Sequence, residues 1–215
     1  MTNTLLKKRF RQFLPVVIDV ETSGLNDDTH ALLELAAVFL EYQDQILTPS
    51  HTLHFHIKPF QGAEFDPKAM EIHEIRPDHP FRMAVNEKDC LEQLNQAIES
   101  ELSKHQCRKA IITGHNPAFD LGFIQKAGKR SAVKPLLHSF SAFDTATLSA
   151  LIFGQTVLAK ALTACHITHD AKEAHSALYD AKQTAKLFCY IINHTRFDPS
   201  KASNLPARIK RPYTR

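Results

Sequence analysis

Two acidic residues stand two positions apart in a segment that is otherwise suited to burial. Asp19 and Glu21 extend the β-branched run at residues 16–18, which follows Pro15 and precedes a Thr-Ser-Gly turn, as is typical of a buried central strand. Side chains two positions apart in a strand point to the same face, so the two carboxylates would lie side by side. Adjacent buried carboxylates destabilise a fold unless a lysine, an arginine or water at the strand end compensates their charge.

Two later segments add carboxylates and histidines at the junctions of expected elements. Asp120 ends the segment 115–120, which joins a predicted buried strand to a helix. Asp180 lies near the start of the last long helix, five residues after His175. Five residues turn about 500° on a regular helix, so these two side chains would not share a face. We therefore expect His175 on the loop or first turn, where it can reach over a site that Asp180 anchors.

This set of side chains indicates metal-dependent hydrolysis of a phosphodiester. Four acids from three segments can hold two hard divalent cations, because such cations prefer oxygen ligands. Two ions about 3.5–4 Å apart can contact both the attacking and the leaving oxygen of a phosphoryl displacement. A histidine can take the proton from the attacking water, since imidazole changes its charge near neutral pH.

The three segments together resemble the exonuclease motifs of the DEDD superfamily, in its histidine-containing branch. The matching residues are Asp19-x-Glu21-Thr22, His115-Asn116-x-x-Phe119-Asp120 and His175-x-x-x-x-Asp180. One such motif is a weak signal, but three in this order at these separations are specific. The resemblance implies a ribonuclease H-like fold, with His175 as the general base. It also implies two bound Mg²⁺ ions, or Mn²⁺ in their place, and these metal ligands: Asp19, Glu21, Asp120 and Asp180.

Longer strings narrow the resemblance to one group of that branch, bacterial exoribonucleases that trim small stable RNAs. The strings fall within roughly residues 9–195 and are Pro15–Thr22, Thr52–His56, Gly154–Leu158 and Ala174–Asp180. The resemblance implies that the chain trims single-stranded 3′ ends of transfer RNA and other small stable RNAs and releases nucleoside 5′-monophosphates. It also implies activity on single-stranded DNA ends and slower cleavage at terminal cytosines.

The same resemblance implies a homodimer, in which a basic patch on one subunit guides RNA to the active site of the other. Between positions 104 and 134 the sequence has seven basic residues and one acid, which favours a nucleic-acid surface there over a merely solvated helix face. The candidates for the patch are Arg9, Arg11, Lys104, Arg108, Lys109, Lys126, Lys129, Arg130 and Lys134.

Single-stranded ends are held by stacking bases on aromatic rings, and the group uses several phenylalanines and a glutamate for this purpose. Phe119 and Phe140 fall on matching positions, although Phe119 could otherwise belong to the core. Leu25 and Ile72 stand where the group has phenylalanine, and Lys68 stands where it has glutamate. These differences put the base preference in doubt and leave the chemistry unchanged.

Other polar residues have structural explanations that compete with functional ones. His54 and His56 share one strand face and could bind zinc, but no third ligand stands near them in the sequence, which argues against a zinc site. Asp144 precedes Thr145 at a strand-to-helix junction, where we expect a helix cap rather than a fifth acid in the site. His115 and Asn116 are expected to fix the turn that presents Asp120.

These residues must be positioned by strands and helices. The order of the expected elements along the chain predicts an α/β domain with a mixed sheet of about five strands, flanked by helices. Periodicity alone leaves 31–40 open between strand and helix, and the alternating segment 51–57 favours a strand paired antiparallel to it. The expected strands are 16–20, 31–40, 51–57, 110–113 and 140–143. The expected helices are 67–75, 85–102, 117–129, 145–152, 156–165 and 176–194.

Composition and charge fit this interpretation. The 215 residues are 43% hydrophobic and 23% charged, as in a globular protein, and no apolar run approaches the length of a membrane helix. The four cysteines are dispersed and the N-terminus is unlike a secretory signal, so we expect the protein to be located in the reducing cytoplasm. We expect one exonuclease domain at 1–198 and a basic, flexible tail at 199–215. The two ends, residues 1–13 and 201–215, have basic but no acidic side chains. The segment between them has 17 basic and 23 acidic side chains and is therefore net negative.

Two other functions compete with this one. The first is a DNA-directed proofreading or repair exonuclease on the same fold, which the longer strings disfavour. The second is a nucleic-acid-binding module whose catalytic centre has decayed. That alternative predicts the loss of at least one acid or of the histidine, whereas all five positions are filled.

Overall fold

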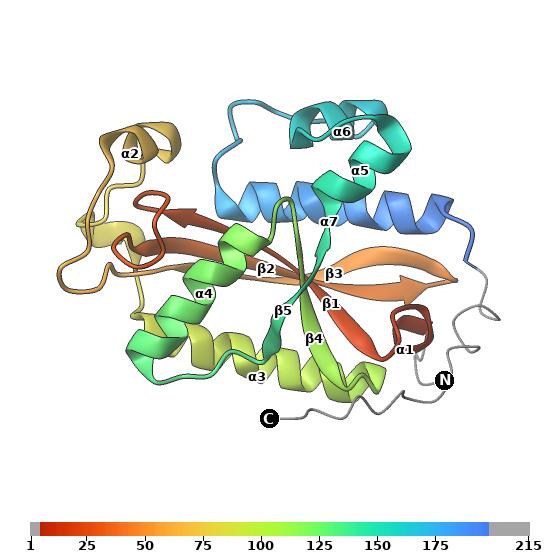
Figure 1. The fold of residues 1–215 in the computed structure, drawn as a ribbon, viewed down its shortest axis with the longest axis horizontal. Helices are drawn as coiled ribbons and strands as arrows, with labels where there is room; N and C mark the ends of the chain where they lie inside the picture. Colours follow the sequence, from red (N-terminus) through yellow and green to blue (C-terminus); the bar gives the residue numbers. More distant parts are fainter. Residues whose placement is uncertain (1–4, 198–215) are drawn as a thin grey trace, which may run out of the picture.

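A mixed five-stranded sheet forms the centre of the computed structural model, which describes residues 5–197 (Figure 1). Its strands lie in the order β3-β2-β1-β4-β5, with β1, β2 and β3 antiparallel and with β4 and β5 parallel to β1. The strands are β1 (Phe13–Thr22), β2 (Leu32–Gln43), β3 (Ile46–His56), β4 (Lys109–Gly114) and β5 (Leu137–Asp144). The expected α/β fold with a mixed five-stranded sheet is therefore confirmed.

Helices cover both faces of the sheet (Figure 1). The long helix α7 runs along one face, with α5 and α6 packed outside it, and α3 and α4 lie against the other face. The helices are α1 (Leu5–Arg9), α2 (Pro67–His73), α3 (Glu87–His105), α4 (Ala118–Ser131), α5 (Thr145–Phe153), α6 (Leu158–Ala164) and α7 (Ala177–His194), with the 3₁₀ helix η1 at Pro80–Arg82. The six expected helices are present; the short α1 and η1 were not predicted.

Because helices cover both faces of the sheet, the central strands are apolar along most of their length. On β1, Leu14, Val16 and Ile18 are fully buried, and every residue of β2 from Leu32 to Leu40 is buried. A strand buried on both faces has no polar side to alternate with, which is why periodicity alone could not separate strand from helix at 31–40. Antiparallel pairing with β3 confirms the strand assignment.

Several smaller expectations can also be compared with the structure. All four cysteines are free thiols, and three of them are buried. Within residues 5–197, no single helix is long and apolar enough to cross a membrane, and only the bent pair α5 and α6 together reaches that length and composition. The predicted basic tail at 199–215 lies outside the described residues.

Candidate active site

The carboxyl end of β1 gathers the four predicted acids. Asp19 and Glu21 on β1 and Asp180 on α7 each place a carboxylate oxygen within 4.8 Å of the other two. Asp120, in the first turn of α4, is buried, and its Oδ1 accepts a hydrogen bond of 3.0 Å from the backbone N–H of Val20, between the two acids of β1. The structure thus brings together residues that are separated by up to 161 positions in the chain.

The turn that delivers Asp120 is fixed by a second set of hydrogen bonds. Asn116 adopts a positive φ of 67°, and its backbone N–H donates to Asp144 Oδ1 at 3.0 Å. His115 bonds to Thr145 Oγ1 at 3.0 Å and to the carbonyl of Thr156 at 2.7 Å. Asp144 also accepts from the first backbone N–H groups of α5. The predicted cap and the predicted turn-fixing role are both confirmed. Partial burial alone would raise the pKa of Asp144, but the hydrogen bonds that its carboxylate accepts outweigh this effect and lower the pKa.

His175 lies on the loop directly before α7, as expected from its spacing to Asp180. Its φ is 67°, and its backbone N–H donates to Asp180 Oδ2 at 2.9 Å. The side chain is exposed to solvent. One carboxylate therefore anchors the loop that carries the histidine, while the imidazole remains accessible to a substrate.

Electrostatics separates these acids from ordinary surface carboxylates. Within residues 5–197, no lysine or arginine forms an ion pair with any of the four. Burial, followed by the nearby carboxylates, raises the pKa of Asp19 well above its usual range and that of Glu21 to about 8. Burial also raises the pKa of Asp120 to about 7, against the Val20 hydrogen bond, and raises that of Asp180. Clustered oxygen donors of this kind fit divalent cations, whose charge would stabilise the ionised forms.

Two polar residues of this region were absent from the motifs. Glu34 on β2 is buried and lies directly opposite Glu21 in the sheet register, where its charge contributes to the raised pKa of Glu21. His73 at the end of α2 bonds through Nε2 to the carbonyl of Thr22 at 3.1 Å. Glu34 had a visible signal, because it is the only charged residue in the apolar run 31–40.

The predicted base-binding residues are mostly exposed apolar side chains. Leu25 follows β1, Ile72 and the exposed Lys68 lie on α2, and the backbone N–H of Asp66 joins α2 to the end of β1 by donating to the Ser23 carbonyl at 2.7 Å. Leu25 is 80% and Ile72 57% exposed.

The two predicted phenylalanines differ in their positions. Phe119 is 37% exposed, precedes Asp120 and packs on Phe123 with ring centroids 4.9 Å apart. It therefore has both a core contact and an open edge. Phe140 is 81% exposed and lies on β5, two strands away from β1, against His138.

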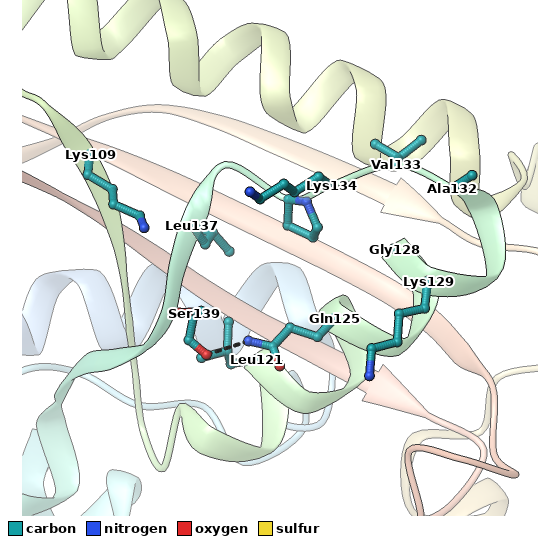
Figure 2. Close-up of a pocket in the computed structure, with 11 residues that line it drawn as sticks. Lys109, Leu121, Gln125, Gly128, Lys129, Ala132, Val133, Lys134, Leu137 and Ser139 are labelled. Carbon is teal, nitrogen blue, oxygen red and sulfur yellow. Dashed lines mark hydrogen bonds between the residues drawn. The ribbon is translucent and has the colours of Figure 1, made fainter. Parts of the chain in front are cut away.

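Among the described residues, some basic candidates form an ion pair with an acid and others, here called unpaired, form none. Lys104 pairs with Glu41 and Glu101, Lys126 with Asp28, and Arg130 with Glu87. Figure 2 shows three others, Lys109, Lys129 and Lys134, around one pocket of about 490 Å³ between α4, β4 and β5. Arg108 is exposed, whereas Arg9 and Arg11 line a second cavity of about 710 Å³ beside α1.

The fold and the four convergent acids define a class, the metal-dependent 3′-to-5′ exonucleases of the DEDD type. Comparison with known proteins agrees, because a family model described as Exonuclease (RNase_T) matches residues 16–188. Ribonuclease T of Shewanella oneidensis is 50% identical over 190 residues, which are 87% of this chain and 86% of that protein. Ribonuclease T of Histophilus somni is 46% identical over 194 residues, 89% of each chain. The chain belongs to the ribonuclease T family of exonucleases, as the longer strings indicated.

Solved structures confirm the fold at lower sequence identity. Escherichia coli exonuclease I in complex with a dT13 oligonucleotide superposes with a TM-score of 0.62 at 18% identity, over 83% of this chain and 41% of that one. A zinc-bound form of that enzyme with single-stranded DNA gives a TM-score of 0.64 at 20% identity, over 84% and 40% of the two chains. The present chain thus spans less than half the length of exonuclease I.

Proposed function

We propose that this exonuclease trims single-stranded 3′ ends of transfer RNA and other small stable RNAs, and also single-stranded DNA ends, releasing nucleoside 5′-monophosphates. The observation that carries the proposal is the set of four acids at the end of β1, beside an exposed histidine, none of which forms an ion pair with a lysine or arginine of residues 5–197. Relatives named Ribonuclease T that are about half identical to this chain support RNA as the substrate.

The metal ligands in this proposal are Asp19, Glu21, Asp120 and Asp180. Their all-oxygen donor set favours Mg²⁺, with Mn²⁺ as an alternative. Bound there, two divalent cations would neutralise charge that develops on the phosphodiester during displacement. The chain's own contribution is to hold the four carboxylates together before substrate arrives, through the sheet register of β1 and the hydrogen bond from Val20 to Asp120.

His175 is the general base in this proposal. Its imidazole nitrogen accepts a proton from the attacking water, whose oxygen forms the new bond to phosphorus. The bond from phosphorus to the 3′ oxygen of the preceding nucleotide breaks, and that oxygen takes up a proton from solvent water as it leaves. The hydrogen bond from the backbone of His175 to Asp180 supports this role, because it would hold the base beside a phosphate bound at the four acids.

The terminal bases would be held by stacking on Phe119 and by the exposed side chains of Leu25 and Ile72. An aromatic ring contributes about 1–3 kcal/mol per stacked base, and an aliphatic side chain lacks the π-face on which such stacking depends. Phe140 would contact a base only in a longer substrate or from another subunit, because it lies on β5. Lys68 adds a positive charge on α2, where the family has an acid, so a different base preference is expected.

The unpaired basic side chains would bind the RNA backbone. Lys109 and Lys134 at one pocket, and Arg9 and Arg11 at the other, are the side chains we assign to phosphate contacts. The family resemblance supports a homodimer in which this surface serves the partner subunit's active site, and free thiols support a reducing cytoplasm.

The test is incubation of the purified protein with a transfer RNA that carries a 3′ extension, with Mg²⁺, with Mn²⁺ or with a chelator. The proposal expects shortening from the 3′ end and release of 5′-monophosphates with metal, and neither with chelator. Single-stranded DNA of the same length is the matched substrate. Preference for DNA by more than tenfold would favour the DNA-directed alternative, and inactivity on both would favour the decayed binding module.

A further inference from the structure

A second group of potential ligands lies on the strands next to the four acids. We call it the histidine–glutamate cluster, and it consists of Glu34 on β2 with His54 and His56 on β3. The sequence argued against zinc at the two histidines because no third ligand stands near them. The fold supplies one, since Glu34 pairs directly with His56 in the β2–β3 register and His54 shares the strand face of His56.

The geometry of the histidine–glutamate cluster is that of converging ligand atoms. Each of the three side chains offers one atom, and these atoms all lie within 4.8 Å of one another. His54 Nε2 already contacts Glu34 Oε1 directly, and the two imidazole rings meet edge to face with centroids 4.7 Å apart. In the described part of the chain, the buried Nδ1 of His56 has no hydrogen-bond partner. Such an atom costs free energy unless something satisfies it.

The chemistry of the donors separates this cluster from the acids of β1. Imidazole nitrogen suits Zn²⁺ and other late transition-metal dications, whereas Mg²⁺ prefers oxygen throughout. Two histidines and one carboxylate are also a complete protein ligand set for a zinc site that leaves a fourth position to solvent. We propose that Glu34, His54 and His56 form a zinc site, distinct from the magnesium site at the end of β1. Zinc bound there would take the place of the direct contact between His54 and Glu34.

The position of the cluster gives zinc a consequence for catalysis. Glu21, Glu34 and His56 occupy one transverse row of the sheet, on β1, β2 and β3. A dication held by the second and third members of this row repels a dication at the first, since like charges at short range disfavour each other. Zinc therefore raises the Mg²⁺ concentration that the nuclease needs.

The experiment measures zinc binding directly. The full chain is dialysed against Zn²⁺ in a large excess of Mg²⁺, which occupies the oxygen ligands, and bound zinc is counted by atomic absorption. The variants are His54→Gln and His56→Gln, each of which removes one imidazole. His51→Gln is the matched control, because His51 lies on the same strand at an odd separation from the cluster and stacks on Phe39.

The expected result is one zinc per chain in the wild type and in His51→Gln. Each cluster variant should lose more than the 10–100-fold in affinity that removal of an outer-shell partner costs. Equal zinc binding by all four proteins, or none by the wild type, would overturn the proposal. Thermal unfolding shows which variants are folded, and either cluster variant alone suffices. Because bound metal is counted without RNA, failure of the zinc site is distinguishable from failure of the proposed substrates.

Discussion

Buried and half-buried carboxylates occur in two regions of this molecule, and the regions differ in whether a basic side chain pairs with them. On α3, Glu87 and Glu101 are both buried, and each has a basic partner: Arg130 lies 2.7 Å from Glu87, and His105 lies 3.1 Å from Glu101. At the end of β1, the buried Asp120 and the half-buried Asp19 and Glu21 have no such partner among the described residues. The chain can therefore neutralise a buried acid with its own side chains, and at β1 it does not.

The difference shows where the protein depends on something from outside. A paired carboxylate is stabilised by the fold alone, whereas clustered unpaired ones raise one another's pKa and favour the protonated form. In an exonuclease of this family, such a cluster can hold cations. Under the proposed function, the paired acids on α3 serve the fold, whereas the unpaired acids on β1 serve catalysis at a cost in stability.

The largest effect is expected from Asp19→Asn, which should abolish nuclease activity. Asp19 lies among the other acids, so loss of its charge removes a metal ligand and relieves like-charge repulsion. Its unfolding temperature without metal should be equal to or above that of the wild type. Hydrolysis of a 3′-extended RNA and a melting curve measure the two effects. An active Asp19→Asn protein would refute the assignment of the metal site.

His175→Ala should lose about 10²–10⁴-fold in turnover, the usual contribution of a general base, and should keep metal and RNA binding because the four acids remain. Because a general base acts only in its unprotonated form, the wild-type rate should rise with pH and then level off, and the variant should lack that rise. The measurement is the pH–rate profile of both proteins at saturating Mg²⁺. If the variant stayed near full activity with the same rising limb, the proton would go to another group.

Lysines with and without an ion-pair partner should likewise differ in how much they contribute to RNA binding. Lys109→Ala combined with Lys134→Ala should weaken binding by about tenfold and reduce the slope of log affinity against log salt by about 1.4, or about 0.7 for each lost phosphate contact on a single strand. Turnover at saturation should stay near normal. Lys126→Ala is the control, because Lys126 is already paired with Asp28 and should change binding less. A collapse of maximal rate with unchanged affinity would contradict the assignment.

On the structural side of the comparison, Glu87→Gln should keep nuclease activity and lower the free energy of unfolding by about 1–3 kcal/mol, because Arg130 loses charged hydrogen bonds. Chemical denaturation measures this loss. Asp19→Asn and Glu87→Gln should therefore have opposite effects: the first removes activity and spares stability, and the second does the reverse.

Much of this arrangement could be predicted from the sequence, because local patterns carried it. Residues 16–18 predicted β1, and the five-residue spacing of His175 and Asp180 placed the histidine before α7 rather than on it. The family motifs then connected acids from three segments, a connection that no single segment contains.

What the sequence did not predict depends on register between strands. Glu34 joins the site only because β2 places it opposite Glu21, and it completes the histidine–glutamate cluster only because β3 places His56 opposite it. The division of the basic residues into paired and unpaired was hidden because it depends on packing between elements that are far apart in the chain. Arg130 and Glu87 are 43 positions apart in the chain and meet through the packing of α4 on α3.

The central claim is that the unpaired acids form a binding site for divalent cations. Measuring the unfolding temperature as a function of pH, with and without Mg²⁺, tests this claim most directly. The folded-state pKa is about 8 for Glu21 and about 7 for Asp120, against ordinary values of 4.5 and 3.8. Groups with raised folded pKa values stabilise the protonated fold, so the stability they contribute is complete below about pH 4 and is lost as pH rises to about 8. The metal-free protein should therefore unfold at progressively lower temperature across that range, and Mg²⁺ should restore several degrees, most of all near pH 8. A metal-free unfolding temperature that rises over the same range, or one that Mg²⁺ leaves unchanged at pH 8, would contradict the account.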